Sequence, residues 1–157
     1  MLLVTLSINN DKFGLNAEMV HEIIPVISLQ PVPMSQDYIA GIFKYHDCMV
    51  PVIDLCRLFE NRDASMLFST RIILAKYKKH DQTYILGIIA ENITECLKVD
   101  DSNFVRTGVS VQNGKMLGEV ICVNGEMVQR INLEALLPDD VHELLFNDDI
   151  ASPEVVA

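Results

Sequence analysis

Short apolar runs, each closed by residues that favour turns, recur along almost the whole chain. The clearest case is Asn124-Gly125, which separates the runs 116–123 and 126–133. Both of its residues tolerate the positive φ angles of a two-residue hairpin turn. Polar turns over 9–11 and 78–81 separate similar runs. A series of roughly eight or nine short strands with only brief helices predicts an all-β fold, either a sandwich or a pair of barrels.

Three short helical segments are expected between these strands. Residues 17–24 carry apolar side chains at helical spacing. Asp54 can accept hydrogen bonds from the free backbone N–H groups of a helix that follows it. The terminal helix is expected over 133–137 and, after Pro138, over 139–146, where one of the first two aspartates would cap it. These segments are too short for a parallel α/β nucleotide-binding fold, and the chain lacks both G-x-G-x-x-G and G-x-x-x-x-G-K.

Charge and hydropathy argue against several classes of partner. The net charge of -10 repels phosphate backbones and anionic lipid headgroups, so neither nucleic acid nor a membrane surface is expected to bind. No basic region precedes the first apolar run, and charged or polar residues interrupt every later one. We therefore expect a soluble protein with no signal peptide and no direct membrane insertion. Residues 147–157 are expected to form a disordered acidic tail.

Candidates for catalysis and metal binding are weak. His46 and Cys48 lie close in sequence but lack a third, orienting residue. Glu91 and Glu95 fit an ordinary strand edge better than a pair of acid-base groups. The four histidines lie in separate predicted elements without ligand spacing, and each is interpreted as a surface or partly covered side chain. The four cysteines form no C-x-x-C pair and are expected to be reduced and mostly buried, as in a cytoplasmic protein. We predict no catalytic residues, no metal and no cofactor.

An ordered series of motifs resembles the CheW-like domain family. The residues that carry the resemblance are Phe13-Gly14-Leu15, Val20-His21-Glu22-Ile23, the stretch around Pro31-Val32-Pro33, the hairpin 38–47 and Val50-Pro51-Val52-Ile53-Asp54-Leu55, followed by 71–74, 86–95 and 117–120. No single motif is decisive, but their order is specific, and the resemblance covers residues 1–146. The hairpin and the stretch 86–95 look closest to adaptors of Wsp-type surface-sensing systems.

The resemblance implies two SH3-like five-stranded β-barrels sharing a core, divided near residues 62–70. It also implies a cytoplasmic, non-catalytic adaptor. Such proteins bind the regulatory domain of a CheA-type histidine kinase and, in a groove between the barrels, the cytoplasmic tip of a methyl-accepting chemotaxis receptor. The positions that match the family's contact motifs, and that we predict to bind partners, are Val20, Glu22, Ile23, Gly41, Lys44, His46 and Asp47.

The hairpin tip departs from the family pattern. His46-Asp47 stands where the family usually has Arg-Gly, and Lys44 stands where it has Asn. The family arginine commonly pairs with the glutamate that is Glu22 here. We hypothesise a Glu22–His46 pair that forms only when the imidazole is charged, with two separately solvated side chains as the alternative.

Two other functions remain open. The chain could bind a small ligand or act as a thiol-dependent enzyme, with Cys48 or His46 as the reactive group in the space between the barrels. It could also regulate by competing with another CheW-like protein for the kinase.

Overall fold

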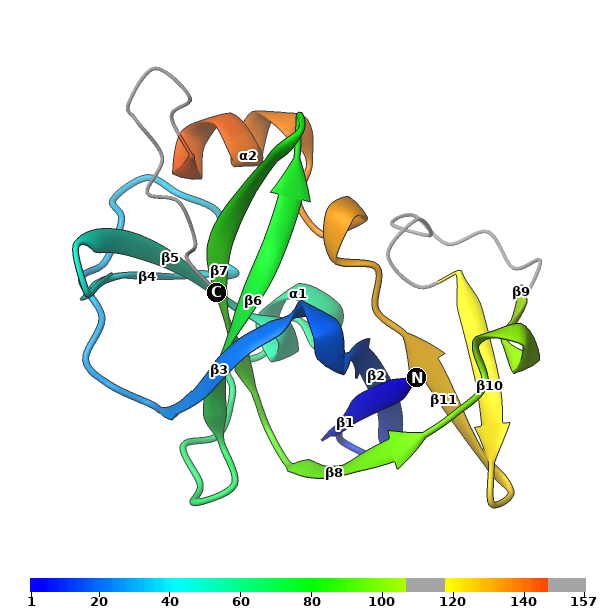
Figure 1. Cartoon of the computed structure of the whole chain (residues 1–157). Helices are drawn as coiled ribbons and strands as arrows, with labels where there is room; N and C mark the ends of the chain where they lie inside the picture. The colour runs from blue at the N-terminus through cyan, green and yellow to red at the C-terminus, as the bar shows by residue number, and fades with distance from the viewer. Residues whose placement is uncertain (107–117, 147–157) are drawn as a thin grey trace.

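The computed structural model describes residues 1–106 and 118–146, which form two curved β-sheets with short helices between them (Figure 1). The first sheet has the strand order β8-β1-β2-β11-β10-β9. Its strands are β1 (Leu2–Ile8), β2 (Asp11–Asn16), β8 (Ile93–Lys98), β9 (Val105–Arg106), β10 (Glu119–Val123) and β11 (Glu126–Arg130).

The second sheet has the strand order β3-β6-β7-β5-β4. Its strands are β3 (Val20–Pro25), β4 (Ile39–Tyr45), β5 (Cys48–Asp54), β6 (Arg71–Lys79) and β7 (Gln82–Ala90). The all-β prediction is confirmed. The first sheet also has five principal strands, and the two-residue β9 is added at its edge.

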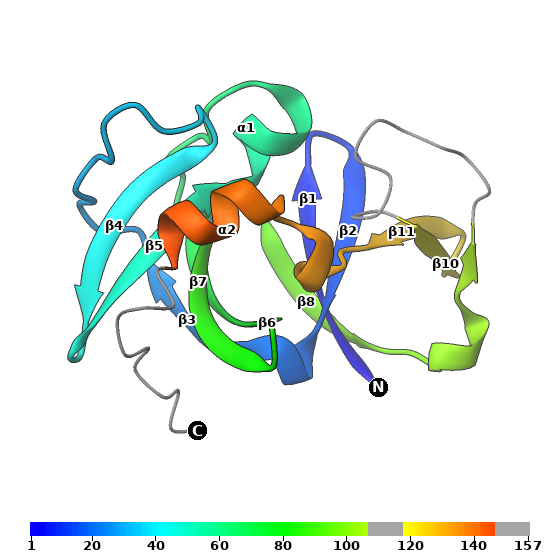
Figure 2. The ribbon, with the colours of Figure 1, turned by 90° about the horizontal axis from the view of Figure 1, so that it is seen from above.

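The chain leaves the first sheet and later returns to it. It crosses to the second sheet at the 3-10 helix η1 (Ala17–Met19) and re-enters the first at β8. β11 pairs in parallel with β2, which brings the two ends of the chain into one sheet. β5 pairs in parallel with β7, which connects the β4–β5 hairpin to the rest of the second sheet. Residues 62–70, where we expected the division between barrels, lie between the helix Leu55–Glu60 and β6. Figure 2 shows the two sheets lying side by side.

Tight two-residue turns close several hairpins as the sequence predicted. Asn124 and Gly125 have φ angles of 52° and 81°, and His80 and Asp81 have φ angles of 52° and 61°. Two consecutive positive φ angles match the right-handed twist of the adjoining strands. At the β4–β5 turn, His46 takes the positive φ, at 53°.

The helix predicted over residues 17–24 is wrong. Only Ala17–Met19 is helical, and Val20–Pro25 forms β3. The β-branched Val20, Ile23 and Ile24 favour extended backbone, and antiparallel pairing with β6 supplies the hydrogen bonds that so short a helix could provide only at high nucleation cost. A register shift between Val20 and Glu22 breaks the simple alternation along this strand.

The helix predicted after Asp54 is confirmed as α1 (Leu55–Glu60), and the Asp54 carboxylate accepts hydrogen bonds from the N–H groups of Cys56 and Arg57. Two more 3-10 helices are present, η2 (Asp101–Asn103) and η3 (Leu133–Ala135). The last helix, α2 (Asp139–Leu145), lies over one end of the second sheet (Figures 1 and 2).

The predicted aspartate cap of α2 is wrong. Its N-cap is Pro138, without a side-chain cap, and the Asp139 carboxylate instead lies 2.8 Å from Lys79 Nζ on β6. The nearby cation competes for the carboxylate more strongly than the helix N–H groups do. In the described ranges, no helix is long and apolar enough to span a bilayer.

Two predictions about burial also fail. His142 on α2 is fully buried, whereas we expected a surface or partly covered side chain. It packs in an aromatic cluster with the rings of Tyr77, Tyr84 and Phe146, because α2 covers this end of the sheet. All four cysteines are free thiols, but Cys96 and Cys122 are exposed, and only Cys56 is fully buried. The predicted acidic tail, 147–157, and the turn at Asn113-Gly114 lie outside the described residues.

Candidate functional site

The outer edges of the second sheet, β3 and β4, are joined by contacts across the gap between them. The Tyr45 hydroxyl on β4 donates a hydrogen bond to the Glu22 carboxylate on β3. Farther along β4, Ile42 exchanges two backbone hydrogen bonds of 2.8 Å with Gln30, in the connection that runs from β3 to β4. Strands at opposite ends of the sheet order therefore face each other, and the partner-binding residues that we predicted lie on or beside these two edges.

The seven predicted residues differ in accessibility. Glu22, Ile23, Lys44, His46 and Asp47 are exposed, and the exposed fraction of Ile23 is 40%. Val20 is half-buried and packs against the core. Their role in binding a partner stays a prediction.

Gly41 is buried, and its backbone explains why a glycine stands there. Its φ is +150°, and a Cβ atom at this position would lie 2.6 Å from the Gln30 carbonyl oxygen. A side chain would therefore push apart the backbone bridge between Gln30 and Ile42. Gly41 therefore lies beneath the surface that the exposed residues form, and its predicted role in binding a partner stays a prediction.

The hypothesised Glu22–His46 pair is replaced by another contact. The Glu22 carboxylate accepts its hydrogen bond from Tyr45, and the His46 ring lies against the Tyr45 ring with centroids 4.4 Å apart. This hydrogen bond to a carboxylate raises the pKa of Tyr45 to about 12, with smaller contributions from burial and from the charge of Glu22. The phenol therefore remains a neutral donor throughout the physiological range. The sequence offered no signal for Tyr45, because the family pattern directs attention to the turn.

The alternative that placed Cys48 and His46 between the two sheets does not fit the structure. Both residues lie at the tip of the β4–β5 hairpin, and this tip points away from the first sheet in Figures 1 and 2. Cys48 is half-buried and pairs across the hairpin with Tyr45. Among the described residues, no group of three or more His, Cys, Asp or Glu side chains is arranged to hold a metal ion.

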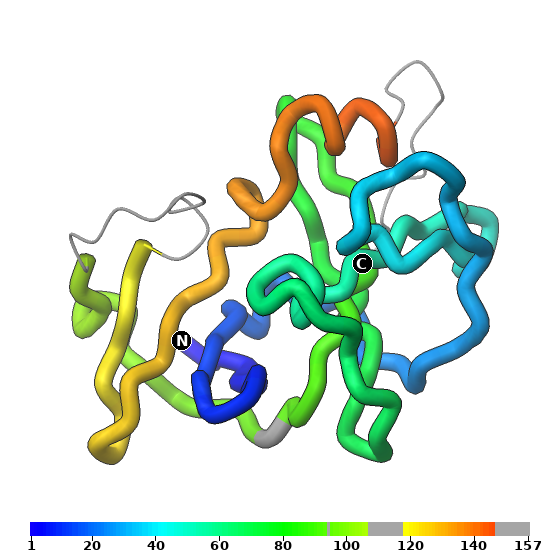
Figure 3. Tube along the Cα trace, turned by 180° about the vertical axis from the view of Figure 1, so that it is seen from behind, coloured from blue at the N-terminus to red at the C-terminus, as the bar shows by residue number. Residues whose placement is uncertain are grey.

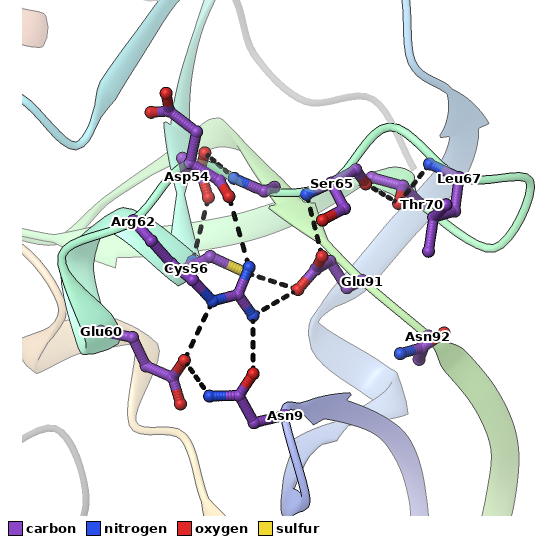
Figure 4. A network of polar contacts seen from close by, with 12 residues as sticks. Asn9, Asp54, Cys56, Glu60, Arg62, Ser65, Leu67, Thr70, Glu91 and Asn92 are labelled. Carbon is purple, nitrogen blue, oxygen red and sulfur yellow. Dashed lines mark hydrogen bonds and ion pairs between the residues drawn. The ribbon is translucent and has the colours of Figure 1, made fainter.

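A buried polar network lies at the foot of the second sheet, centred on Glu91 (Figure 4). The Glu91 side chain is 6% exposed, and its carboxylate lies 2.7 Å from Arg62 Nη2. It also accepts hydrogen bonds from the Cys56 thiol, at 3.0 Å, and from the backbone N–H of Ser65, at 2.8 Å. Our interpretation of Glu91 as part of an ordinary strand edge is therefore wrong: the chain turns just after β7 and carries this carboxylate inward.

Burial and charge set the titration of this network. The Arg62 hydrogen bond lowers the pKa of Glu91 to about 2, with further lowering by Cys56 and Ser65, and these effects outweigh the opposing cost of burial. Burial, followed by the hydrogen bond to Glu91, raises the pKa of Cys56 to about 12. A thiol with so high a pKa is not a nucleophile at neutral pH. The network is therefore suited to holding structure rather than to catalysis.

The network holds the loop 61–70, which projects from the foot of the second sheet (Figure 3). Asp54 accepts a hydrogen bond of 2.9 Å from the Ala64 N–H, next to the Ser65 N–H that Glu91 binds. The Thr70 hydroxyl donates to the Ser65 carbonyl oxygen and closes the loop. Three exposed apolar residues form the tip between these anchors: Met66, Leu67 and Phe68.

Two interleaved curved sheets, with parallel pairing between strands that are distant in sequence, define a small all-β domain. The family model described as "CheW-like domain" matches residues 2–141. The chain belongs to the CheW-like domain family, as the resemblance predicted.

Individual relatives agree with this assignment. The chain is 26% identical over 101 residues to "Chemotaxis protein CheW" of Treponema pallidum, an alignment that covers 64% of this chain and 59% of the relative. It is 40% identical over 45 residues to "Chemotaxis protein CheV3" of Helicobacter pylori, covering 29% of this chain and 14% of the relative. The chain thus spans less than two thirds of the length of these curated relatives.

A solved structure has the same fold. The crystal structure of the scaffolding protein TtCheW from Thermoanaerobacter tengcongensis matches with a TM-score of 0.76 and 22% sequence identity, covering 87% of each chain.

Proposed function

We propose that this protein is a cytoplasmic, non-catalytic adaptor that couples a methyl-accepting chemotaxis-type receptor to a CheA-type histidine kinase. The observation that carries the proposal is the match of the CheW-like family model to residues 2–141. The names of the curated relatives, both chemotaxis proteins, support it. The partners that this proposal implies are the regulatory domain of the kinase and the helical cytoplasmic tip of the receptor.

The physical task of such an adaptor is to present rigid surfaces, and the second sheet provides one. Exposed apolar and charged side chains stand on the joined edges of β3 and β4, with the core directly beneath them. An amphipathic receptor helix binds through apolar anchors at helical spacing, and Ile23 is an exposed apolar contact for one of these. Glu22, Lys44, His46 and Asp47 surround it with polar groups that specify orientation.

Ile23→Asp is the sharpest test of receptor binding. Val20→Asp would also disturb the core, because Val20 packs against it, whereas Ile23 is 40% exposed. In Ile23→Asp, the new carboxylate would be buried in the contact without a partner. It should weaken binding of a receptor-tip fragment from the same organism by at least about tenfold. Calorimetric titration measures this affinity, and circular dichroism checks the fold.

Met127→Asp is the control, because Met127 is also an exposed apolar residue, at 60%, and lies on β11 of the other sheet. Its affinity for the receptor fragment should equal that of the wild type. Equal affinity of the Ile23→Asp variant and the wild type would exclude this face as the receptor site. Absence of binding by the wild type to both the receptor fragment and the kinase regulatory domain would contradict the adaptor function itself.

A further inference from the structure

The second sheet needs something other than strand pairing to hold its two edges together. In the strand order, β3 and β4 stand at opposite ends, so no ladder of backbone hydrogen bonds links them directly. The Gln30–Ile42 bridge ties the connecting segment to the middle of β4. At the C-terminal end of β4, the hydrogen bond from Tyr45 to Glu22 reaches across to β3.

The surroundings of Tyr45 fix the direction of its hydroxyl. The rings of Phe43, His46 and His21 lie around the phenol ring, with centroids 6.3, 4.4 and 6.0 Å from it. His21 and Glu22 come from β3, whereas Phe43 and Tyr45 come from β4. The ring is thus contacted from both edges, and its hydroxyl donates a hydrogen bond to the Glu22 carboxylate.

We propose that Tyr45 is a positioning residue of the partner-binding face: its hydroxyl holds Glu22 across the gap between β3 and β4 and sets the relative placement of these edges before a partner binds. This inference rests on the proposed adaptor function and deepens it. A face that is already in its bound geometry loses less side-chain freedom on binding. A phenylalanine would keep the ring contacts but release the Glu22 carboxylate.

The first experiment examines the contact without a partner. The phenol titration of Tyr45 is followed by NMR of the 13Cζ resonance, assigned by its loss in Tyr45→Phe. The wild-type pKa should lie near 12, and Glu22→Gln should shift it toward the ordinary value of 10. Tyr38, half-buried next to β4, is the internal control, and its titration should not respond to Glu22→Gln. An unchanged Tyr45 titration in Glu22→Gln would overturn the proposal.

The second experiment is a double-mutant cycle on affinity for the receptor-tip fragment. Tyr45→Phe should weaken binding by about fivefold, the effect of one typical hydrogen bond, and Glu22→Ala, which removes the acceptor, by at least as much. The double variant should be no weaker than Glu22→Ala alone, because Tyr45→Phe removes nothing further once the Glu22 carboxylate is absent. Tyr38→Phe should bind like the wild type.

The outcomes separate the inference from the proposed function. Additive losses in the cycle, or a Tyr45→Phe variant that binds as tightly as the wild type, would show that Tyr45 does not act through Glu22. If the wild type binds no receptor fragment, the adaptor function fails for this partner. The titration then still decides whether Tyr45 holds Glu22.

Discussion

Replacing Glu91 by glutamine should remove a substantial part of the stability of this protein in a pH-dependent way. The pKa of this carboxyl is lowered from 4.5 to about 2, and a difference of this size corresponds to about 3 kcal/mol of the free energy of unfolding at neutral pH. Arg62 is about one-third exposed, so solvent screens part of the interaction. We therefore expect Glu91→Gln to lose about 2 kcal/mol at pH 7.

The sign of the pH dependence follows from the direction of the shift. A carboxyl whose pKa is lower in the folded state contributes its full stabilisation above the pKa of the unfolded state, 4.5. That contribution is lost as the pH falls through the folded-state pKa of about 2. The difference in free energy of unfolding between the wild type and Glu91→Gln should therefore be constant from pH 7 to about pH 5 and shrink toward pH 2.

Urea unfolding at a series of pH values, followed by circular dichroism, measures this difference. Glu95→Gln is the matched control, because the Glu95 side chain is 51% exposed and lies 3.7 Å from Lys12 Nζ. It should cost at most about 0.5 kcal/mol at any pH. A loss of the same small size for Glu91→Gln, or a difference from wild type that does not change between pH 5 and pH 2, would refute the reasoning.

Two further predictions concern thiols and glycines. In the native protein, a thiol reagent at pH 8 should label the exposed Cys96 and Cys122 first and Cys48 more slowly. Cys56 should be labelled only on unfolding, since burial raises its pKa to about 12. Mass spectrometry of tryptic peptides checks the order, and early labelling of Cys56 would contradict the buried network. Gly41→Ala should destabilise the fold by about 2 kcal/mol through the clash with Gln30. Gly125→Ala, at a positive φ but with no neighbour within 4 Å, should cost only about 1 kcal/mol; equal losses in thermal unfolding would contradict this account.

Local patterns predicted much of this fold because short-range physics determines them. The turn at Asn124-Gly125 and the cap at Asp54 depend on backbone angles and hydrogen bonds within a few residues, and both are as expected. The strand β3 was missed because an apolar pattern over so short a segment fits either a helix or a strand. Pairing with β6, residues distant in sequence, decides between them.

The polar contacts of the site were harder to predict, because they join residues that are far apart in sequence. Glu91 meets Arg62 and Ser65 only after β6 and β7 have folded back, and His142 becomes buried only when α2 packs on Tyr77. We expected His46 to contact Glu22, but Tyr45 makes this contact, because its side chain lies one residue earlier on the strand and reaches the Glu22 carboxylate. Spacing along one chain does not contain this information.

The parallel pairing of β2 with β11 has a consequence for how the molecule is made. Residues 12–14 find their neighbours at residues 128–130, near the opposite end of the described chain. During translation, β2 is synthesised long before β11. One edge of β2 therefore stays unpaired until more than a hundred further residues have been synthesised. Completion of the first sheet is thus a late event, and a polypeptide truncated before β11 would keep an open strand edge that invites aggregation.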